Sequence, residues 1–180
     1  MSGRSTIDEI DDLAPGACAT ALAPLFEGAP AFLGRLCAAR PFGTPEDLFS
    51  TARAIAHAMP EADQVELIDA HPRLGAPPAT VSGLSFVEQG YDRETAERAH
   101  ADAERERLRL ASELDALNEA YEARFGFRYC VFVAGRSRAE LVPGIRRALD
   151  ADRGTELQRA LDAVIDIAAD RWARLNDPGA

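Results

Sequence analysis

Apolar residues recur along most of this chain at intervals of three and four residues, the spacing of one face of an α-helix. The first stripes comprise Ile7, Ile10 and Leu13, then Leu22, Leu25 and Phe26, then Phe32, Leu33 and Leu36. A last helix is expected from near Thr155, with an apolar face of Leu157, Leu161, Val164, Ala168, Trp172 and Leu175. The pattern predicts an all-α fold, a single-domain bundle of about seven to nine helices over residues 1–180.

Two helices in the first half carry clear boundary signals. Thr44 can cap a helix that has Pro45 at its first position and two acids in its first turn. This helix should run to about Met59. A second helix, 61–70, must end near His71, because Pro72 disfavours the helical conformation in the residue before it. The Pro- and Gly-rich stretch 72–83 is expected to be a loop.

The second half predicts a long charged helix over about 93–125, followed by a helix opened by a Ser137–Glu140 capping box and running towards Asp150. One segment breaks the helical pattern. Tyr129 to Val133 is a short apolar run rich in β-favouring residues, with no obvious partner strand. It is interpreted as a buried extended segment or as the start of a helix.

Composition narrows the classes of partner. The formal net charge is −10, so neither nucleic acid nor an anionic membrane is an expected partner, and no apolar run approaches a membrane span. The first thirteen residues do not resemble a signal peptide, and cytoplasmic location is expected. Cys18, Cys37 and Cys130 lack metal or redox spacing and are interpreted as small buried thiols in a reducing compartment.

His71 is the first candidate for chemistry. Histidine exchanges protons near neutral pH, and a helix end followed by proline would fix its backbone and present the ring from a loop. The alternative is a histidine that merely favours the negative C-terminus of its helix. His57 and His100 are weaker candidates, and the three histidines show no metal-ligand spacing.

The stretch from Ser85 to Gly90 is the second candidate. Ser85 and Glu88 have the spacing of a capping box, so a simple helix start is one interpretation. The functional alternative uses Glu88 and Gln89 to recognise a ring with N–H and C=O groups, and the free N–H groups of a helix N-terminus to hold an anion.

Arg171 falls at the edge of the apolar face of the last helix. It is either a side chain whose stem covers the core while its charge reaches water, or a charge directed into a cavity to hold a carboxylate. The chain has no lysine, so Schiff-base chemistry through a lysine is excluded, and no nucleotide loop, zinc motif or Ser-His-Asp signature is present.

Together these residues resemble the OHCU decarboxylase family, whose substrate is 2-oxo-4-hydroxy-4-carboxy-5-ureidoimidazoline (OHCU). The resemblance covers nearly the whole chain and keeps the family's order. It is carried by the blocks Arg40-Pro41-Phe42, Ala70-His71-Pro72-Arg73-Leu74-Gly75, Ser85-Phe86-Val87-Glu88-Gln89-Gly90, Leu117-Asn118-Glu119-Ala120-Tyr121, Arg124-Phe125-Gly126-Phe127 and Ile167-Ala168-Ala169-Asp170-Arg171.

The resemblance implies a carboxy-lyase that forms (S)-allantoin in urate degradation, with no metal or organic cofactor and commonly as a homodimer. It places catalytic roles on His71, Glu88 and Arg171. The substrate-binding residues that it implies are Pro72, Ser85, Phe86, Val87, Gln89, Tyr129, Cys130, Val131, Phe132 and Val133. Two alternatives remain open: a non-catalytic helical interaction module, and a decarboxylase of a related heterocyclic acid.

Overall fold

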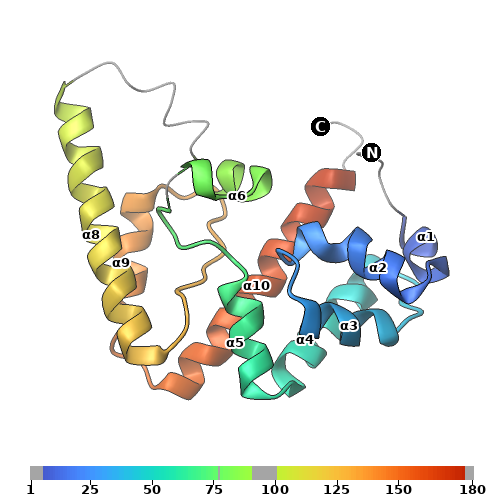
Figure 1. The fold of residues 1–180 in the computed structure, drawn as a ribbon. Coiled ribbons are helices and arrows are strands. Elements are labelled where there is room, and N and C mark those ends of the chain that lie inside the picture. The colour runs from blue at the N-terminus through green and yellow to red at the C-terminus, as the bar shows by residue number, and fades with distance from the viewer. Residues whose placement is uncertain (1–5, 77, 91–100, 177–180) are drawn as a thin grey trace. The chain divides into compact units, whose positions relative to one another are not determined.

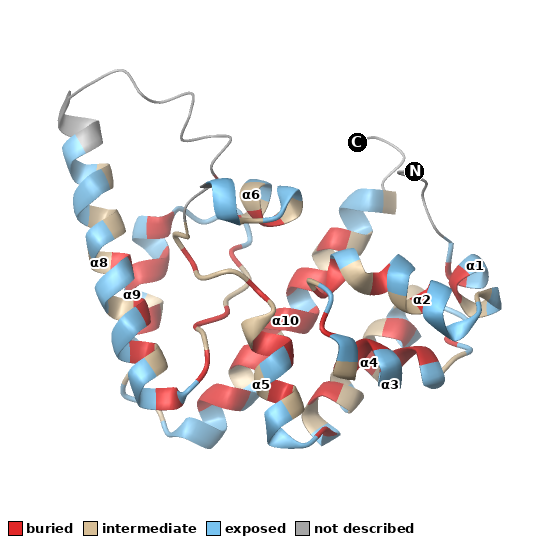
Figure 2. Cartoon of the chain, in the orientation of Figure 1, coloured by how far each residue is buried: buried red, intermediate tan, exposed pale blue. Residues whose placement is uncertain are grey.

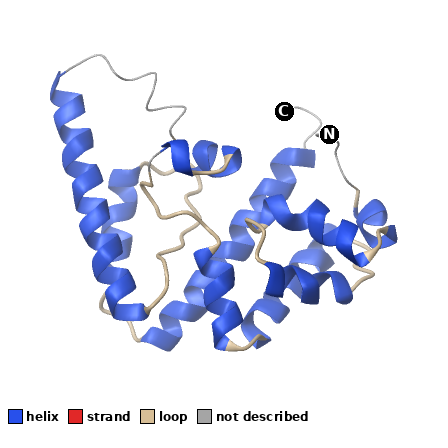
Figure 3. Cartoon of the chain, viewed as in Figure 1, coloured by secondary structure: helices blue, strands red, loops and turns tan. Residues whose placement is uncertain are grey.

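The computed structural model describes residues 6–76, 78–90 and 101–176. Within these ranges the chain forms nine α-helices, two short 3-10 turns and no strand, which confirms the all-α prediction (Figures 1 and 3). The helices are α1 (Ile7–Asp12), α2 (Pro15–Leu22), α3 (Pro30–Ala38), α4 (Pro45–Ala58), α5 (Glu61–Asp69), α6 (Gly83–Glu88), α8 (Ala101–Phe125), α9 (Arg138–Ala148) and α10 (Arg153–Asn176). The 3-10 turns are η1 (Ala23–Leu25) and η2 (Pro78–Thr80).

The chain divides into two compact units. The first comprises residues 1–71 and 158–180, and the second comprises residues 72–157. The first unit is therefore built from two separate stretches of chain. Helix α10 begins in the second unit and continues into the first.

Helix α3 is central to the first unit, where it contacts α2, α4 and α5. Pro30 occupies its first turn, and its buried side chains are Phe32, Leu33, Leu36 and Cys37. These four residues lie on one helical face, as the stripe in the sequence predicted. Figure 2 shows buried positions on the helices that surround α3 as well.

The boundary signals of α4 and α5 are confirmed. The Thr44 side chain accepts a hydrogen bond from the Asp47 N–H at 3.0 Å, and Pro45 begins α4. Helix α5 ends at Asp69, directly before the expected stop. Both boundaries depend on local chemistry, because a cap or a proline acts within one turn of its own position.

In the second unit, α8 and α9 pack against one another, and an aromatic cluster lies at the C-terminal end of α8. The Tyr121 ring lies 4.6 Å from Phe125, 5.8 Å from Phe127 and 5.1 Å from Tyr129, measured between ring centroids. The Tyr121 hydroxyl donates to the Glu156 carboxylate at 2.7 Å. The cluster joins α8 to the first turn of α10 and to the chain that follows α8.

The segment from Tyr129 to Val133 contains neither helix nor strand, so the interpretation as the start of a helix is wrong. Tyr129, Cys130 and Val133 are buried. The long charged helix is confirmed over Ala101–Phe125. Its expected first residues, 93–100, lie outside the described part of the chain.

Three details of the sequence interpretation were wrong. Cys18 and Cys37 form a disulfide instead of remaining free thiols, whereas Cys130 is a buried free cysteine. The last helix was expected from near Thr155, and this is confirmed: it begins at Arg153, and the Asp152 carboxylate accepts from the Thr155 N–H at 2.9 Å. At its other end, Trp172 is only half-buried and Leu175 is 47% exposed, so the apolar face ends earlier than expected.

The start of α6 is the third correction. The Ser82 side chain accepts from the Ser85 N–H at 3.2 Å, so Ser82 is the cap and Ser85 lies inside the helix. The Ser85–Glu88 capping box does not form, because Glu88 is the last residue of this short helix. None of the described helices is long and apolar enough to cross a membrane.

Candidate active site

His71 lies just beyond α5 and is buried, with 4% of its surface exposed. Its N–H donates to the Ile68 carbonyl at 3.1 Å, which continues the helical turn, and Pro72 then directs the chain away. The ring Nδ1 lies 3.3 Å from the Leu67 carbonyl oxygen. Because a carbonyl can only accept a hydrogen bond, Nδ1 must carry the proton, and the lone pair of the neutral ring lies on Nε2.

The pKa of His71 is lowered from 6.5 to about 4, chiefly by burial and also by the positive charge of Arg171. The negative charge of Glu27 and the bond to Leu67 oppose this shift. The imidazole is therefore neutral at neutral pH, with Nε2 able to accept a proton. The alternative interpretation of His71, as a residue that stabilises the helix C-terminus by its positive charge, requires a protonated ring and does not fit a neutral one.

Arg171 is 1% exposed, so the interpretation in which its charge reaches water is wrong. Its Nη1 donates to the carbonyl oxygens of Pro24 and Leu25 at 3.0 and 3.1 Å, and its Nη2 donates to the Glu27 carboxylate at 2.8 Å. All three acceptors belong to the turn 24–27. The guanidinium is thus an inward-directed charge held by one segment of backbone and one carboxylate.

Glu27 is the residue that the sequence interpretation missed. It follows η1, its side chain is 15% exposed, and its backbone is left-handed, with φ of 50°. A signal for it exists in the sequence, because Glu27 is the only charged residue between Ala14 and Gly34. Where such an apolar stretch is buried, a charge within it needs a partner of opposite charge.

In the second unit, the chain that follows His71 is held by polar side chains. Gln89 accepts from the Gly75 N–H at 2.8 Å and donates to the Arg73 carbonyl at 3.2 Å. The Asn118 amide donates to the Leu74 carbonyl at 2.9 Å. The Gln89 carboxamide, expected to recognise a ligand, bonds to the protein's own loop.

Gly75 meets a conformational requirement in this loop. Its φ is +83°, and a Cβ at this position would lie 3.3 Å from the Leu114 side chain. A larger residue would be strained by the backbone angle and crowded by α8. The 73–75 loop therefore has one backbone path, fixed by Gln89, Asn118 and this glycine.

The remaining expected binding residues also lie in the second unit. Ser85 is buried within α6, Phe86 and Glu88 are half-buried, and Val87 is 47% exposed. Because Ser82 caps α6 and accepts from the N–H groups of Ser85 and Phe86, the stretch 85–89 does not offer the free N–H groups of a helix N-terminus, and that part of the expectation was wrong. In the second stretch, the Phe132 and Val133 carbonyls accept from Arg136.

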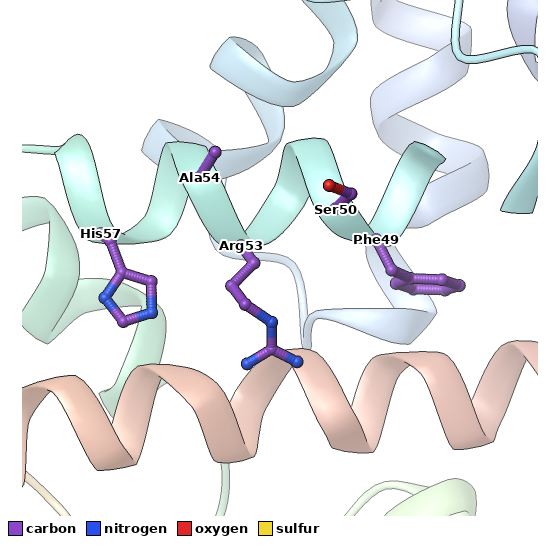
Figure 4. Close-up of a pocket in the computed structure, with 5 residues that line it drawn as sticks. All are labelled: Phe49, Ser50, Arg53, Ala54 and His57. Carbon is purple, nitrogen blue, oxygen red and sulfur yellow. The ribbon is translucent and has the colours of Figure 1, made fainter. Parts of the chain in front are cut away.

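A separate open pocket of about 520 Å³ lies along α4. Its lining residues, Phe49, Ser50, Arg53, Ala54 and His57, are drawn in Figure 4. Arg53 donates to Asp162 at 2.5 Å and to Asp166 at 2.6 Å, and His57 contacts Asp162 at 2.8 Å. His57 therefore belongs to a surface ion-pair network between α4 and α10. His100 lies outside the described residues.

The described residues contain no group of three or more His, Cys, Asp or Glu side chains arranged to hold a metal ion. The structure brings His71 and Arg171 together in the first unit, with Glu27 beside them. Gln89 and the 73–75 loop come together in the second unit, which also contains Glu88.

Comparison with known proteins gives a consistent match. The family model described as OHCU decarboxylase matches residues 11–173. The uric acid degradation bifunctional protein PucL of Bacillus subtilis is 30% identical over 93% of this chain, which spans 32% of that protein's length. A protein of Haloferax volcanii named 2-oxo-4-hydroxy-4-carboxy-5-ureidoimidazoline decarboxylase is 26% identical, over 93% of this chain and 94% of its own.

Two solved structures share the fold. A crystal structure of OHCU decarboxylase in the presence of (S)-allantoin has a TM-score of 0.64 at 22% identity, over 87% of this chain and 96% of the other. A crystal structure of (S)-allantoin synthase also has a TM-score of 0.64, at 17% identity, over 96% of this chain and 55% of the other.

Proposed function

The chain belongs to the OHCU decarboxylase family, and from this we propose that it decarboxylates OHCU to (S)-allantoin in urate degradation. The observation that carries this proposal is the buried His71, neutral at neutral pH and lying within the charge of the Arg171–Glu27 pair. A buried neutral imidazole with a defined tautomer can serve as a general base in a site from which water is excluded.

The reaction needs no external electron sink. When the bond to the carboxylate breaks and CO2 leaves, the electron pair forms a C=C bond to the neighbouring ureido-bearing carbon, and the nitrogen of the former C=N takes up a proton. The resulting enol then gains a proton on the ureido-bearing carbon and loses its hydroxyl proton, which forms the ring carbonyl of allantoin. The protein has to orient the ring, move protons and select one face for protonation. We therefore propose that no metal or organic cofactor takes part.

His71 is proposed to exchange the proton, because its Nε2 is the basic ring nitrogen. Arg171 contributes positive charge that complements the anionic substrate and the developing negative charge. Since its guanidinium already donates to Pro24, Leu25 and Glu27, Arg171 is proposed to act on the substrate mainly by long-range electrostatic attraction, and less by direct hydrogen bonds. Glu88 is proposed to accept hydrogen bonds from ring or ureido N–H groups.

Substrate contacts are proposed for the segments that the resemblance indicated. These are Pro72, Ser85, Phe86, Val87 and Gln89, and the non-helical residues Tyr129, Cys130, Val131, Phe132 and Val133. The kinetics of His71→Asn, Glu88→Gln and the double variant test whether Glu88 acts on the same step as His71. Strongly non-additive losses in kcat support a shared step, and additive losses contradict it.

The proposal further includes a homodimer, a cytoplasmic location and one OHCU decarboxylase domain over residues 1–180. Light scattering of the purified protein tests the dimer. Disulfides such as Cys18–Cys37 are rare in the cytoplasm, so the redox state of this pair in cells bears directly on the proposed location. Alkylating free thiols in intact cells before lysis tests both the redox state of this pair and, with fractionation, the location.

The decisive experiment uses OHCU freshly generated from urate by oxidation and hydroxyisourate hydrolysis. Circular dichroism is followed as allantoin forms, with and without the protein. Rapid appearance of one enantiomer, lost in a folded His71→Ala variant, is expected. Racemic product at the uncatalysed rate would contradict the proposal. If the protein instead turned over a different heterocyclic acid, the alternative of a decarboxylase acting on a related substrate would be supported.

A further inference from the structure

The turn 24–27 directs three acceptors at the Arg171 guanidinium. Two are main-chain carbonyl oxygens, at 3.0 and 3.1 Å, and the third is the Glu27 carboxylate, at 2.8 Å. A cation with 1% exposure has lost its hydration and needs compensation from the protein. The carbonyls supply partial charges, whereas Glu27 supplies a full negative charge.

The backbone at Glu27 supports a role for its side chain. Glu27 has φ of 50° and Gly28 has φ of 81°, so two successive residues are left-handed. The Gly28 N–H donates to the Ala23 carbonyl at 3.0 Å and closes the turn. Glycine or asparagine would adopt this conformation at least cost, so the turn alone does not account for a glutamate here.

The alternative is that Glu27 only terminates η1. A residue with that role could direct its side chain to solvent, as exposed turn residues do. Its carboxylate instead reaches a guanidinium 144 positions further along the chain, with 15% of its side chain exposed. The contact therefore joins the N-terminal turn to α10 beside the candidate base.

Glu27 and Arg171 act on His71 in opposite directions. Among the charged groups of the described residues, these two bear on the ring, and the Leu67 carbonyl bonds to it. Arg171 lowers the pKa of His71, and Glu27 raises it. A change at Glu27 thus alters both the tether of Arg171 and the charge that reaches the base.

We propose that Glu27 is a positioning residue of the active site, whose carboxylate holds Arg171 on the 24–27 turn and balances the charge facing His71. This inference rests on the proposed function for its effect on turnover. The tether itself is independent of the reaction and can be measured without substrate.

The first test measures the tether by nitrogen-15 NMR of the arginine side chains, with Arg171→Lys used to assign the Arg171 signal. In the wild type, a guanidinium held by three acceptors should rotate slowly about its Cζ–Nε bond. Glu27→Gln is expected to accelerate this rotation and to broaden or shift the Nε–H signal. An unchanged signal in a folded Glu27→Gln protein would overturn the inference.

Glu66→Gln is the matched control. It removes one negative charge from the same unit at a side chain that also makes a long-range contact, since the Glu66 carboxylate accepts from the Ala31 N–H at 3.0 Å, a bond that the glutamine oxygen can still accept. It is expected to leave the Arg171 signal unchanged. A change equal to that of Glu27→Gln would show a general effect of charge or stability and would overturn the inference.

The second test is kinetic, with OHCU as substrate. Glu27→Gln should lower kcat about tenfold or more with a smaller change in KM, and Glu66→Gln should stay within about twofold of the wild type. Glu27→Asp keeps the charge, suits a left-handed backbone better, and should recover part of kcat. If Glu27→Asp is folded and no better than Glu27→Gln, the charge is not required and the inference fails.

The two tests separate this inference from the proposed function. A wild-type protein that does not turn over OHCU defeats the proposed function, whereas the NMR comparison still decides the tether. If Glu27→Gln does not fold, Glu27→Asp is compared with the wild type in both measurements. A shorter carboxylate that leaves rotation and kcat unchanged would contradict a tether of defined length.

Discussion

At position 71, a helix end, a following proline and a buried cation all act on one imidazole. The hydrogen bond to Leu67 fixes the tautomer, and burial keeps the ring neutral. The positive charge of Arg171 also favours the neutral form of the ring, whereas the negative charge of Glu27 favours its protonated form. Burial, the Leu67 carbonyl and the charges of Arg171 and Glu27 therefore decide both the chemistry available at Nε2 and its dependence on pH.

The first prediction concerns the rate. Because the pKa of His71 in the folded protein is lowered to about 4, a base of this kind remains active well below pH 6.5. The plot of log kcat/KM against pH should be level from about pH 5 to 7 and fall only near pH 4. His57→Asn, which alters the surface network, should show the same acid limb.

An acid limb near pH 6.5 would contradict the assignment of the buried His71 as the base. Measuring at several buffer and salt concentrations excludes a buffer effect. Chemical stability of the substrate is followed in parallel without protein, because its spontaneous decay also depends on pH.

The second prediction concerns stability. Between pH 6.5 and 4 the unfolded chain binds a proton at position 71 and the folded chain does not, so stability falls as pH falls through this window. From pH 7.5 to 5 the loss attributable to His71 should be about 2 kcal/mol, at 1.36 kcal/mol per pKa unit. Urea unfolding of the wild type and of His71→Asn at both pH values measures it.

His71→Asn should show a smaller loss on acidification, since asparagine does not titrate. Equal losses in the two proteins would contradict a lowered pKa in the folded state. The comparison removes the contribution of all other groups, which titrate alike in both proteins.

At the residue scale, the sequence was sufficient to find a candidate site residue where the residues that mark it are its neighbours in the chain. His71 was found from the adjoining helix end and Pro72, and Arg171 from its place beside an apolar face. Glu27 was missed because its meaning depends on a partner 144 positions away. Only the fold brings that partner close, although the isolated charge was visible in the sequence.

At the scale of elements, helix starts show where local chemistry is sufficient and where it is not. Thr44 and the Ser137–Glu140 box were predicted and are confirmed, because each cap bonds to its own first turn. Ser82 and Ser85 are chemically equivalent candidates three residues apart. Ser85 is buried at 2% exposure, and this tertiary effect places the cap at Ser82.

The third prediction concerns the bond between α2 and α3. The Cys18–Cys37 disulfide closes a short loop, with a sequence separation of 19. Removing such a cross-link costs about 3 kcal/mol, because the unfolded chain regains freedom. Cys18→Ser with Cys37→Ser should therefore unfold in less urea than the wild type, and a thiol reductant should lower the wild type's stability similarly.

The reductant should leave the stability of the double variant unchanged, and this comparison is the internal control. Equal stability of wild type and double variant under oxidising conditions would show that the disulfide does not form in solution. Because the chain from Cys18 to Cys37 contains the turn 24–27, the Arg171 signal in the NMR experiment should also be compared in the two proteins.

At the scale of the whole chain, the helical pattern predicted the fold class, because helix periodicity repeats in almost every segment. The division into two units could not be predicted from it. The first unit is assembled from residues 1–71 and 158–180, and no composition shift or linker marks either boundary. One boundary falls within α10, where the sequence shows a single continuous apolar face.

The last prediction is that the two units unfold together as one domain. Trp172 is the chain's only tryptophan and lies in the first unit, whereas Tyr121 and Glu156 lie in the second. Tyr121→Phe removes a buried hydrogen bond to a carboxylate, a loss of about 1.5–3 kcal/mol. If unfolding is cooperative, this change should lower the midpoint of the Trp172 fluorescence transition, and that transition should coincide with the loss of helical circular dichroism. A Trp172 midpoint that stays fixed while the circular dichroism transition splits would instead show two domains, since the first unit would then unfold without regard to the stability of the second.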